Sequence, residues 1–345
     1  MSEYAAEFES LAKSLAKADL STDGGFSSSL WKQLVELGLR EVYLPDSAGA
    51  SHGMIEDLAS LVRTLSRFGL VSPLPLAAVA AWATAEITEA QGRNLTACIL
   101  RDPVQVGDGR LTAQLMNVPW GDTADGLLLI PEGGVDGAIL VELDPSSACS
   151  PGALDPFVHL SLSDARCVRV TQLAPDIRSR LELATLAALM GFVDSVMIQT
   201  QLHVSTRHQF GRPLDSLPAV SAALARASIA VLRADLLLGR AVDGVKDEKV
   251  EAQPHLQLAT RIVVAEAATL VCAIAHQLHG AIGTTSEHSL HRLTSQIWAF
   301  RDWPSSELMA LRTLGEISST CGEESLWNDL TPARFDPPGR SQPEG

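Results

Sequence analysis

The chain has few of the features that disulfide-bonded, metal-binding or nucleic-acid-binding proteins need. Its five cysteines are scattered, odd in number and form no Cys-x-x-Cys pair, which argues against a disulfide framework and fits a reducing compartment. The formal net charge of -15 argues against nucleic acid or an anionic membrane as the main partner. The N-terminus lacks an apolar signal core, and apolar runs are interrupted before they reach membrane-spanning length. We therefore expect a cytoplasmic protein with no nucleic acid and no membrane partner.

Signatures of several large enzyme classes are also missing. The sequence contains no Gly-x-Ser-x-Gly elbow, Walker loop or Gly-x-Gly-x-x-Gly turn, so serine hydrolases, P-loop enzymes and Rossmann dehydrogenases lack support. His276, His279, His288 and His291 lie close together in the sequence, but no cysteine pair or acidic set completes a ligand shell. We expect these histidines to cap and pack helices, and we expect no metal site.

The apolar pattern changes twice along the chain. Apolar residues recur at helical spacing in 1–92, whereas 93–173 contains short apolar runs separated by turn residues, which is typical of strands. Long apolar helical segments return in 174–320, and 321–345 is rich in proline, glycine and charge, so we expect it to be a mobile tail. The prediction is an α+β fold that is mostly α, with an N-terminal helical domain, a small middle β-domain and a C-terminal helical bundle.

The longest apolar segment, Leu181–Val204, ends at the heptapeptide Arg-His-Gln-Phe-Gly-Arg-Pro, residues 207–213. Gly211 can adopt a positive φ and Pro213 cannot donate a helical hydrogen bond, so the backbone must turn here. Pro218 then opens a second apolar segment, as proline does at the first helical position. The sequence predicts two long helices joined by a tight polar connection, and a merely solvated hairpin loop remains an alternative at this point.

A second connection follows the apolar helix predicted for Pro254–Leu278. Gly280 stands where a helix-ending glycine is expected, and Thr284 followed by Glu287 has the spacing of a capping box that starts the next helix. A glycine-flanked loop that leads into a helix N-terminus presents free backbone N–H groups and the positive end of a helix dipole. This pattern predicts an anion-binding connection.

Together, Arg-x-Gln-Phe-Gly and Gln-x-x-Gly-x-x-Gly, both on helix connections, resemble the acyl-CoA dehydrogenase family over about residues 25–315. In that family the two loops hold the pyrophosphate and adenosine half of FAD across a subunit boundary. The resemblance implies that FAD is the cofactor and that its ligands in this chain are Arg207, Gln209, Phe210, Gly211, Gln277, His279, Gly280 and Gly283.

The chain departs from the family where the flavin ring and the acyl chain are bound. Family members carry a Thr-Glu-Pro and a Gly-Ser-Asp early in the β-domain, whereas here Leu100 leads almost directly to Gly107. The family places its catalytic glutamate at one of two positions, which correspond to Leu181 and Pro304, and neither is acidic. We therefore expect no catalytic residue in this chain, with Glu182 and Glu307 as the nearest substitutes.

These departures are similar to the reduced subunit of heteromeric steroid side-chain acyl-CoA dehydrogenases, which contain two copies of each of two subunits. The resemblance implies a homologous full-length partner that carries the glutamate, shares the FAD and binds most of the acyl-CoA, with an electron-transfer flavoprotein as acceptor. One alternative is a self-sufficient homo-oligomeric enzyme that uses Glu307 or Glu182. Another is a non-catalytic assembly paralogue that has kept the fold.

Overall fold

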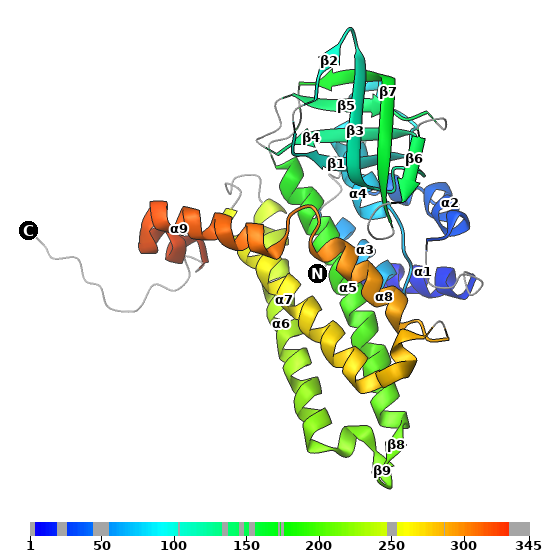
Figure 1. The fold of residues 1–345 in the computed structure, drawn as a ribbon, viewed down its shortest axis with the longest axis vertical. Helices are drawn as coiled ribbons and strands as arrows, with labels where there is room; N and C mark the ends of the chain where they lie inside the picture. Colours follow the sequence, from blue (N-terminus) through cyan, green and yellow to red (C-terminus); the bar gives the residue numbers. More distant parts are fainter. Residues whose placement is uncertain are drawn as a thin grey trace, which may run out of the picture.

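The computed structural model describes residues 4–18, 26–43, 55–102, 104–132, 137–144, 148–151, 156–171, 173, 176–246, 254–285 and 287–330. Figure 1 shows the β-sheet at one end of a long helical bundle, with the N-terminal helices packed beside them. The predicted class, α+β and mostly α, is confirmed. The predicted tail beyond 330 lies outside the described residues.

Four helices form the N-terminal part: α1 (Ala5–Ala18), α2 (Ser28–Glu36), α3 (Ile55–Arg67) and α4 (Leu74–Ala83). Helix α4 ends at Ala83, and a 3-10 turn follows at Thr88–Ala90. The hydroxyl of Thr84 donates to the carbonyl of Ala80 at 2.8 Å.

The middle part is one mixed sheet in the order β1-β4-β5-β7-β3-β2, with β6 paired to β7. Its strands are β1 (Leu95–Leu100), β2 (Val106–Gly107), β3 (Arg110–Pro119), β4 (Gly126–Pro131), β5 (Ala138–Glu142), β6 (Ala148–Pro151) and β7 (Phe157–Val170). Apolar runs in the sequence identify β1, β4, β5 and the start of β7. No apolar run marks β3, because buried and exposed residues alternate along most of this strand.

The C-terminal bundle contains α5 (Ile177–Thr206), α6 (Pro218–Lys246), α7 (Pro254–His279), α8 (Leu290–Arg301) and α9 (Glu307–Leu330). Pro218 and Pro254 open α6 and α7, as their position in the sequence predicts. Helix α9 continues past residue 320 to Leu330, so the proposed start of the tail at 321 is wrong.

Helix α5 is the centre of the bundle, and α3, α4, α6, α7 and α8 all pack against it. By length and composition, Ile177–Thr206 and Pro254–Thr284 could each cross a membrane, although Asp194 and Glu266 interrupt their apolar runs, as expected. Most of the apolar stretch of α5 is nevertheless buried inside the protein, as in the core helix of a helical bundle.

Helices α3 and α5 approach each other closely at Gly191. A Cβ atom there would lie 2.2 Å from the backbone oxygen of Arg63 and 2.7 Å from the Cβ of Ser66. Glycine is required at this position because α3 has to approach the backbone of α5 more closely than any side chain would allow.

We predict that Gly191→Ala lowers the free energy of unfolding by at least about 1–3 kcal/mol, because the added methyl group pushes α3 away from α5. Gly239→Ala is the matched control: this glycine is also inside a helix, and its added Cβ would meet nothing within 4 Å. The control should be neutral or stabilising by up to about 1 kcal/mol. Denaturant unfolding of both variants checks this, and equal effects would contradict the close-packing argument.

Candidate functional site

The first predicted connection is a tight β-hairpin at the tip of the bundle. β8 (His208–Gln209) pairs with β9 (Arg212–Pro213), and the turn between them is Phe210-Gly211. Phe210 has φ +54° and Gly211 has φ +75°, the left-handed conformations that a two-residue hairpin requires at both turn positions. The predicted positive φ at Gly211 is confirmed, whereas the pattern did not predict one at Phe210. The turn presents Phe210 to solvent, where 86% of its surface is exposed.

The second connection differs from its prediction. Helix α7 does end at His279 and Gly280 has φ +63°, as expected for a helix-ending glycine. The predicted capping box is wrong, because α8 begins only at Leu290 and Thr284 instead lies in a 3-10 turn, Gly280–Thr284. The Thr284 hydroxyl donates to the carbonyl of Ala281 at 2.9 Å.

Gly283 is needed for packing within this connection. A Cβ at Gly283 would lie 2.9 Å from the side chain of Leu290 and 3.0 Å from the Cβ of His279. The second glycine of Gln-x-x-Gly-x-x-Gly therefore lets the connection fold against the end of α7. By contrast Gln277 and Gly280 are exposed, so a ligand can reach them.

Three histidine rings join the two connections. The rings of His203 and His279 stack with their centroids 4.3 Å apart, and His288 meets His279 edge-on at 4.9 Å. His279 is only 6% exposed, and burial lowers the pKa of both His203 and His279. His203 was not among the predicted site residues, although its position one helical turn before Arg207 places it on the same side of α5.

All eight predicted cofactor ligands therefore lie on two adjacent connections at the tip of the bundle. Arg207, Gln209, Phe210, Gly211 and Gln277 are exposed, and His279 has a buried Nε2 with no hydrogen-bond partner. Exposed guanidinium, amide and aromatic groups fit a phosphate-containing, aromatic ligand. Within the described residues, no group of three or more metal-binding side chains is found.

The two family positions for the catalytic glutamate lie at the other end of α5, near the sheet. Leu181 is completely buried. Its neighbour Glu182 is 20% exposed at the side chain and lies 3.5 Å from Nε of Arg261, which is fully buried. Burial raises the pKa of Glu182, while Arg261 and Arg178 act in the opposite direction.

Arg261 also holds the second family position in place. Its guanidinium donates to the backbone carbonyls of Trp303 and Ser305, at 2.9 Å for the bond from Nε to Ser305. These two residues flank Pro304. Glu182 is therefore the counter-ion of an arginine that fixes the Pro304 segment, and Glu307 starts α9 beyond it.

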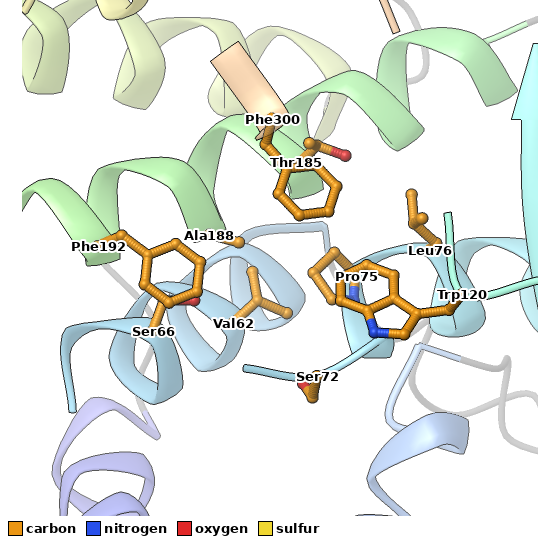
Figure 2. Close-up of a pocket in the computed structure, with 10 residues that line it drawn as sticks. All are labelled: Val62, Ser66, Ser72, Pro75, Leu76, Trp120, Thr185, Ala188, Phe192 and Phe300. Carbon is orange, nitrogen blue, oxygen red and sulfur yellow. The ribbon is translucent and has the colours of Figure 1, made fainter. Parts of the chain in front are cut away.

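A small void lies beside this region, where α3, α4, α5, α8 and the end of β3 meet (Figure 2). Its volume is about 20 Å³, which is room for about one water molecule. Trp120 and Phe300 stack with their centroids 5.3 Å apart and close it. The void is lined by Val62, Ser66, Ser72, Pro75, Leu76, Trp120, Thr185, Ala188, Phe192 and Phe300. Thr185 lies one helical turn from Leu181, so this void adjoins the first of the two glutamate positions. A void of this size cannot hold an acyl chain.

A larger groove of about 460 Å³ separates the sheet from the end of α8. Leu100, Arg101 and Asp102 line one wall, at the place where the family's missing segment would begin, and Trp303 and Pro304 line the other. Arg101 donates to the carbonyl of Pro304 at 3.3 Å across it.

Comparison with known proteins supports the relationship that these motifs suggest. Residues 179–303 match the family model described as acyl-CoA dehydrogenase, C-terminal domain. The predicted resemblance to the acyl-CoA dehydrogenase family is confirmed. The chain is 28% identical over 285 residues to acyl-CoA dehydrogenase IpdE2 of Mycobacterium tuberculosis, covering 80% of this chain and 82% of that protein. It is also 28% identical over 304 residues to acyl-CoA dehydrogenase FadE27 of the same organism, covering 77% and 82%.

Solved acyl-CoA dehydrogenase structures share the fold. The ChsE4-ChsE5 complex of Mycobacterium tuberculosis contains a chain that superposes with a TM-score of 0.78 at 23% identity, covering 92% of this chain and 98% of that one. A chain of the Tcur3481-Tcur3483 steroid acyl-CoA dehydrogenase gives 0.79 with the same identity and coverage. The prediction of FAD as the cofactor agrees with the family match and with the groups on the two connections.

We predict that Arg261→Met lowers the free energy of unfolding by about 3–5 kcal/mol, because it leaves the Glu182 carboxylate without its counter-ion. Glu182→Gln should have a smaller effect, since Arg261 keeps its hydrogen bonds to the backbone carbonyls of Trp303 and Ser305. Combining the two changes should recover part of the loss. Denaturant unfolding of the three variants measures this, and strictly additive effects would contradict the pairing.

The loss in Arg261→Met should also depend on pH. The folded-state pKa of Glu182 is raised, and losing Arg261 raises it further. A raised carboxyl pKa destabilises the folded state above that pKa and no longer does so once the group is protonated. The stability deficit should therefore shrink as pH falls from neutral toward the range in which Glu182 takes up a proton.

Proposed function

We propose that this chain is the reduced subunit of a heteromeric, FAD-dependent acyl-CoA dehydrogenase. In this proposal it contacts the FAD of a homologous full-length partner, and the partner carries the catalytic glutamate and binds most of the acyl-CoA. The reaction is the α,β-dehydrogenation of a CoA thioester, with a steroid side chain as the proposed acyl group and an electron-transfer flavoprotein as the acceptor.

The observation that carries the proposal is the distance between the two ends of α5. The helix has 30 residues and rises about 1.5 Å per residue, so about 45 Å separate the sheet from Arg207. Figure 1 shows the β8–β9 hairpin at the far end of the bundle from the sheet. One dinucleotide cannot contact both, so a cofactor held by these connections has to extend toward the flavin-ring site of a different subunit.

The residues at the sheet end of α5 also support the proposal that the partner carries the catalytic glutamate. Leu181 and Pro304 occupy the two family positions of the glutamate, Glu182 is paired with Arg261, and the adjoining void holds about 20 Å³. A general base for α-proton removal has to stand against the substrate in a dry site with a pKa near the working pH. This chain offers no such base there, and the void beside Leu181 has no room for the acyl group.

Each residue at the tip has a role that suits its chemistry. Arg207 would pair with a phosphate oxygen through its planar guanidinium. The exposed Phe210 would pack along the cofactor and Gln209 would form hydrogen bonds to it. Gln277, His279 and the backbone at Gly280 would line the adenosine and pyrophosphate side. FAD, when bound, accepts the hydride from the β-carbon, and the residues of this chain only hold and orient the cofactor.

Two solved neighbours support the heteromeric form and the substrate class of the proposal. One is the ChsE4-ChsE5 complex of Mycobacterium tuberculosis, and the other is a variant of the Tcur3481-Tcur3483 steroid acyl-CoA dehydrogenase. A self-sufficient homo-oligomer that uses Glu307 is the second candidate, because Glu307 begins α9 directly after the Pro304 segment. A non-catalytic assembly paralogue would have no use for an exposed arginine and phenylalanine on a tight hairpin.

We predict that Arg207→Ala weakens FAD retention by the complex, because a charge-assisted hydrogen bond contributes roughly 1.5–3 kcal/mol, or about tenfold to a hundredfold in affinity. Arg226→Ala, which removes an exposed arginine from α6, should leave retention unchanged. Flavin absorbance per complex during dialysis measures both. Equal FAD retention in the two variants would mean that the hairpin has only a structural role.

We predict that Glu307→Gln and Glu182→Gln leave kcat, measured per bound flavin, within a few-fold of wild type. Loss of a true general base lowers the rate by roughly 10²–10⁴-fold, and the same exchange at the partner's glutamate should do so. Steady-state oxidation of a steroid side-chain CoA ester with an artificial electron acceptor separates the cases. If Glu307→Gln alone abolishes turnover while flavin stays bound, the homo-oligomeric alternative is correct.

A further inference from the structure

The three-histidine stack is the buried contact between the two candidate cofactor connections. His203 lies one helical turn before Arg207 on α5, and His279 directly precedes Gly280 at the end of α7. Their rings stack at 4.3 Å, and His288 of the following connection meets His279 edge-on at 4.9 Å. An exposed hydrogen bond of 3.2 Å from Ser289 to Gln199 is a second link between this connection and α5.

The hydrogen bonds around the stack suit uncharged rings. Nδ1 of His279 lies 2.8 Å from the carbonyl of Ala275 and has to donate to it, which leaves Nε2 without a proton in the neutral ring. That Nε2 is buried and has no acceptor, so a proton placed there would be buried without a partner. Nδ1 of His288 accepts a hydrogen bond of 3.1 Å from the backbone N–H of Leu290, which it can do only while unprotonated.

The charged and titratable groups that act on the stack have one sign. Besides burial, the charge of Arg207 on α5 lowers the pKa of His203, and the charge of His276 on α7 lowers the pKa of His279. The charge of His288 on the connection lowers both pKa values. From α8, His291 acts on His276. Every one of these groups is a cation or becomes one on protonation, and none supplies the negative charge that would stabilise an imidazolium.

We propose that His203 is a positioning residue of the cofactor site: stacked on a neutral His279, it holds the Arg207 hairpin beside the Gly280 connection, and protonation of the stack releases them. This inference rests on the proposed function only for the identity of the ligand. The contact itself is a property of this chain.

Burial is the main cause of the lowered pKa of His203 and His279, and the neighbouring histidines lower it further. A histidine whose folded-state pKa lies below its ordinary value of about 6.5 binds fewer protons when folded than when released. The stabilisation from the stack is therefore complete above about pH 6.5 and is lost as pH falls through the lowered pKa.

The test compares His203→Phe, which keeps a stacking ring but cannot be protonated, with His203→Ala, which removes the ring. Flavin retained by the complex after gel filtration is measured from about pH 8 to about pH 5.5, the range in which histidine titrates. Wild type should lose flavin several-fold as pH falls. His203→Phe should retain it with a clearly weaker pH dependence, and His203→Ala should retain less already at pH 8.

Ser289→Ala is the matched control, since it removes the other link to α5 without changing a titratable group, and its pH dependence should equal that of wild type. A His203→Phe profile that parallels wild type would overturn the proposal, as would a wild-type profile that is flat.

A second measurement separates this proposal from the proposed function. The midpoint of thermal unfolding of the chain, taken over the same pH range, should fall more steeply for wild type than for His203→Phe, whether or not FAD binds. If no variant binds FAD at any pH but this difference is present, the proposed function is wrong and the proposed role of the histidine stack is supported. If FAD binds at pH 8 but the difference is absent, the proposed role of the histidine stack is wrong and the proposed function is supported.

Discussion

The length and burial of α5 govern the rest of this structure. Thirty residues of continuous helix set about 45 Å between the β-sheet and the β8–β9 hairpin. The helix can be continuous and apolar because other helices cover it, and Gly191 lets α3 approach its backbone directly. The role proposed for a residue then depends on which end of α5 it lies near.

The two ends are built for different tasks. At the sheet end, Trp120 and Phe300 close the void, and Arg261 ties Glu182 to the segment around Pro304. At the hairpin end, Arg207, Phe210 and Gln277 are exposed on two connections that the histidine stack joins. An end where the glutamate positions carry no free carboxylate, and an end with exposed polar and aromatic groups, are what a subunit needs if it completes a site in a neighbour.

Much of this could be predicted from the sequence, and the part that could not has a physical reason. The starts of α6 and α7 at Pro218 and Pro254, and the turns at Gly211 and Gly280, depend on the backbone properties of single residues. Such local rules can be read from one sequence.

The features that the sequence did not predict depend on how segments pack together in the folded protein. Strand β3 is polar on one face because only its other face is buried. The Thr284–Glu287 pattern fails to cap a helix, since the 3-10 turn packs Gly283 against Leu290 and delays α8. Neither the pairing of Arg261 with Glu182 nor the stacking of His203 on His279 follows from spacing, because each joins two helices that meet only in the folded bundle.

The most direct test of the central claim, that this chain completes a cofactor site in another subunit, is a count of FAD molecules. Native mass spectrometry of this chain alone, of the partner alone and of the co-expressed complex would give that count. The account predicts no FAD on this chain alone and one FAD for each pair of unlike chains in the complex. Stoichiometric FAD on this chain alone, or one FAD for every chain of the complex, would contradict it.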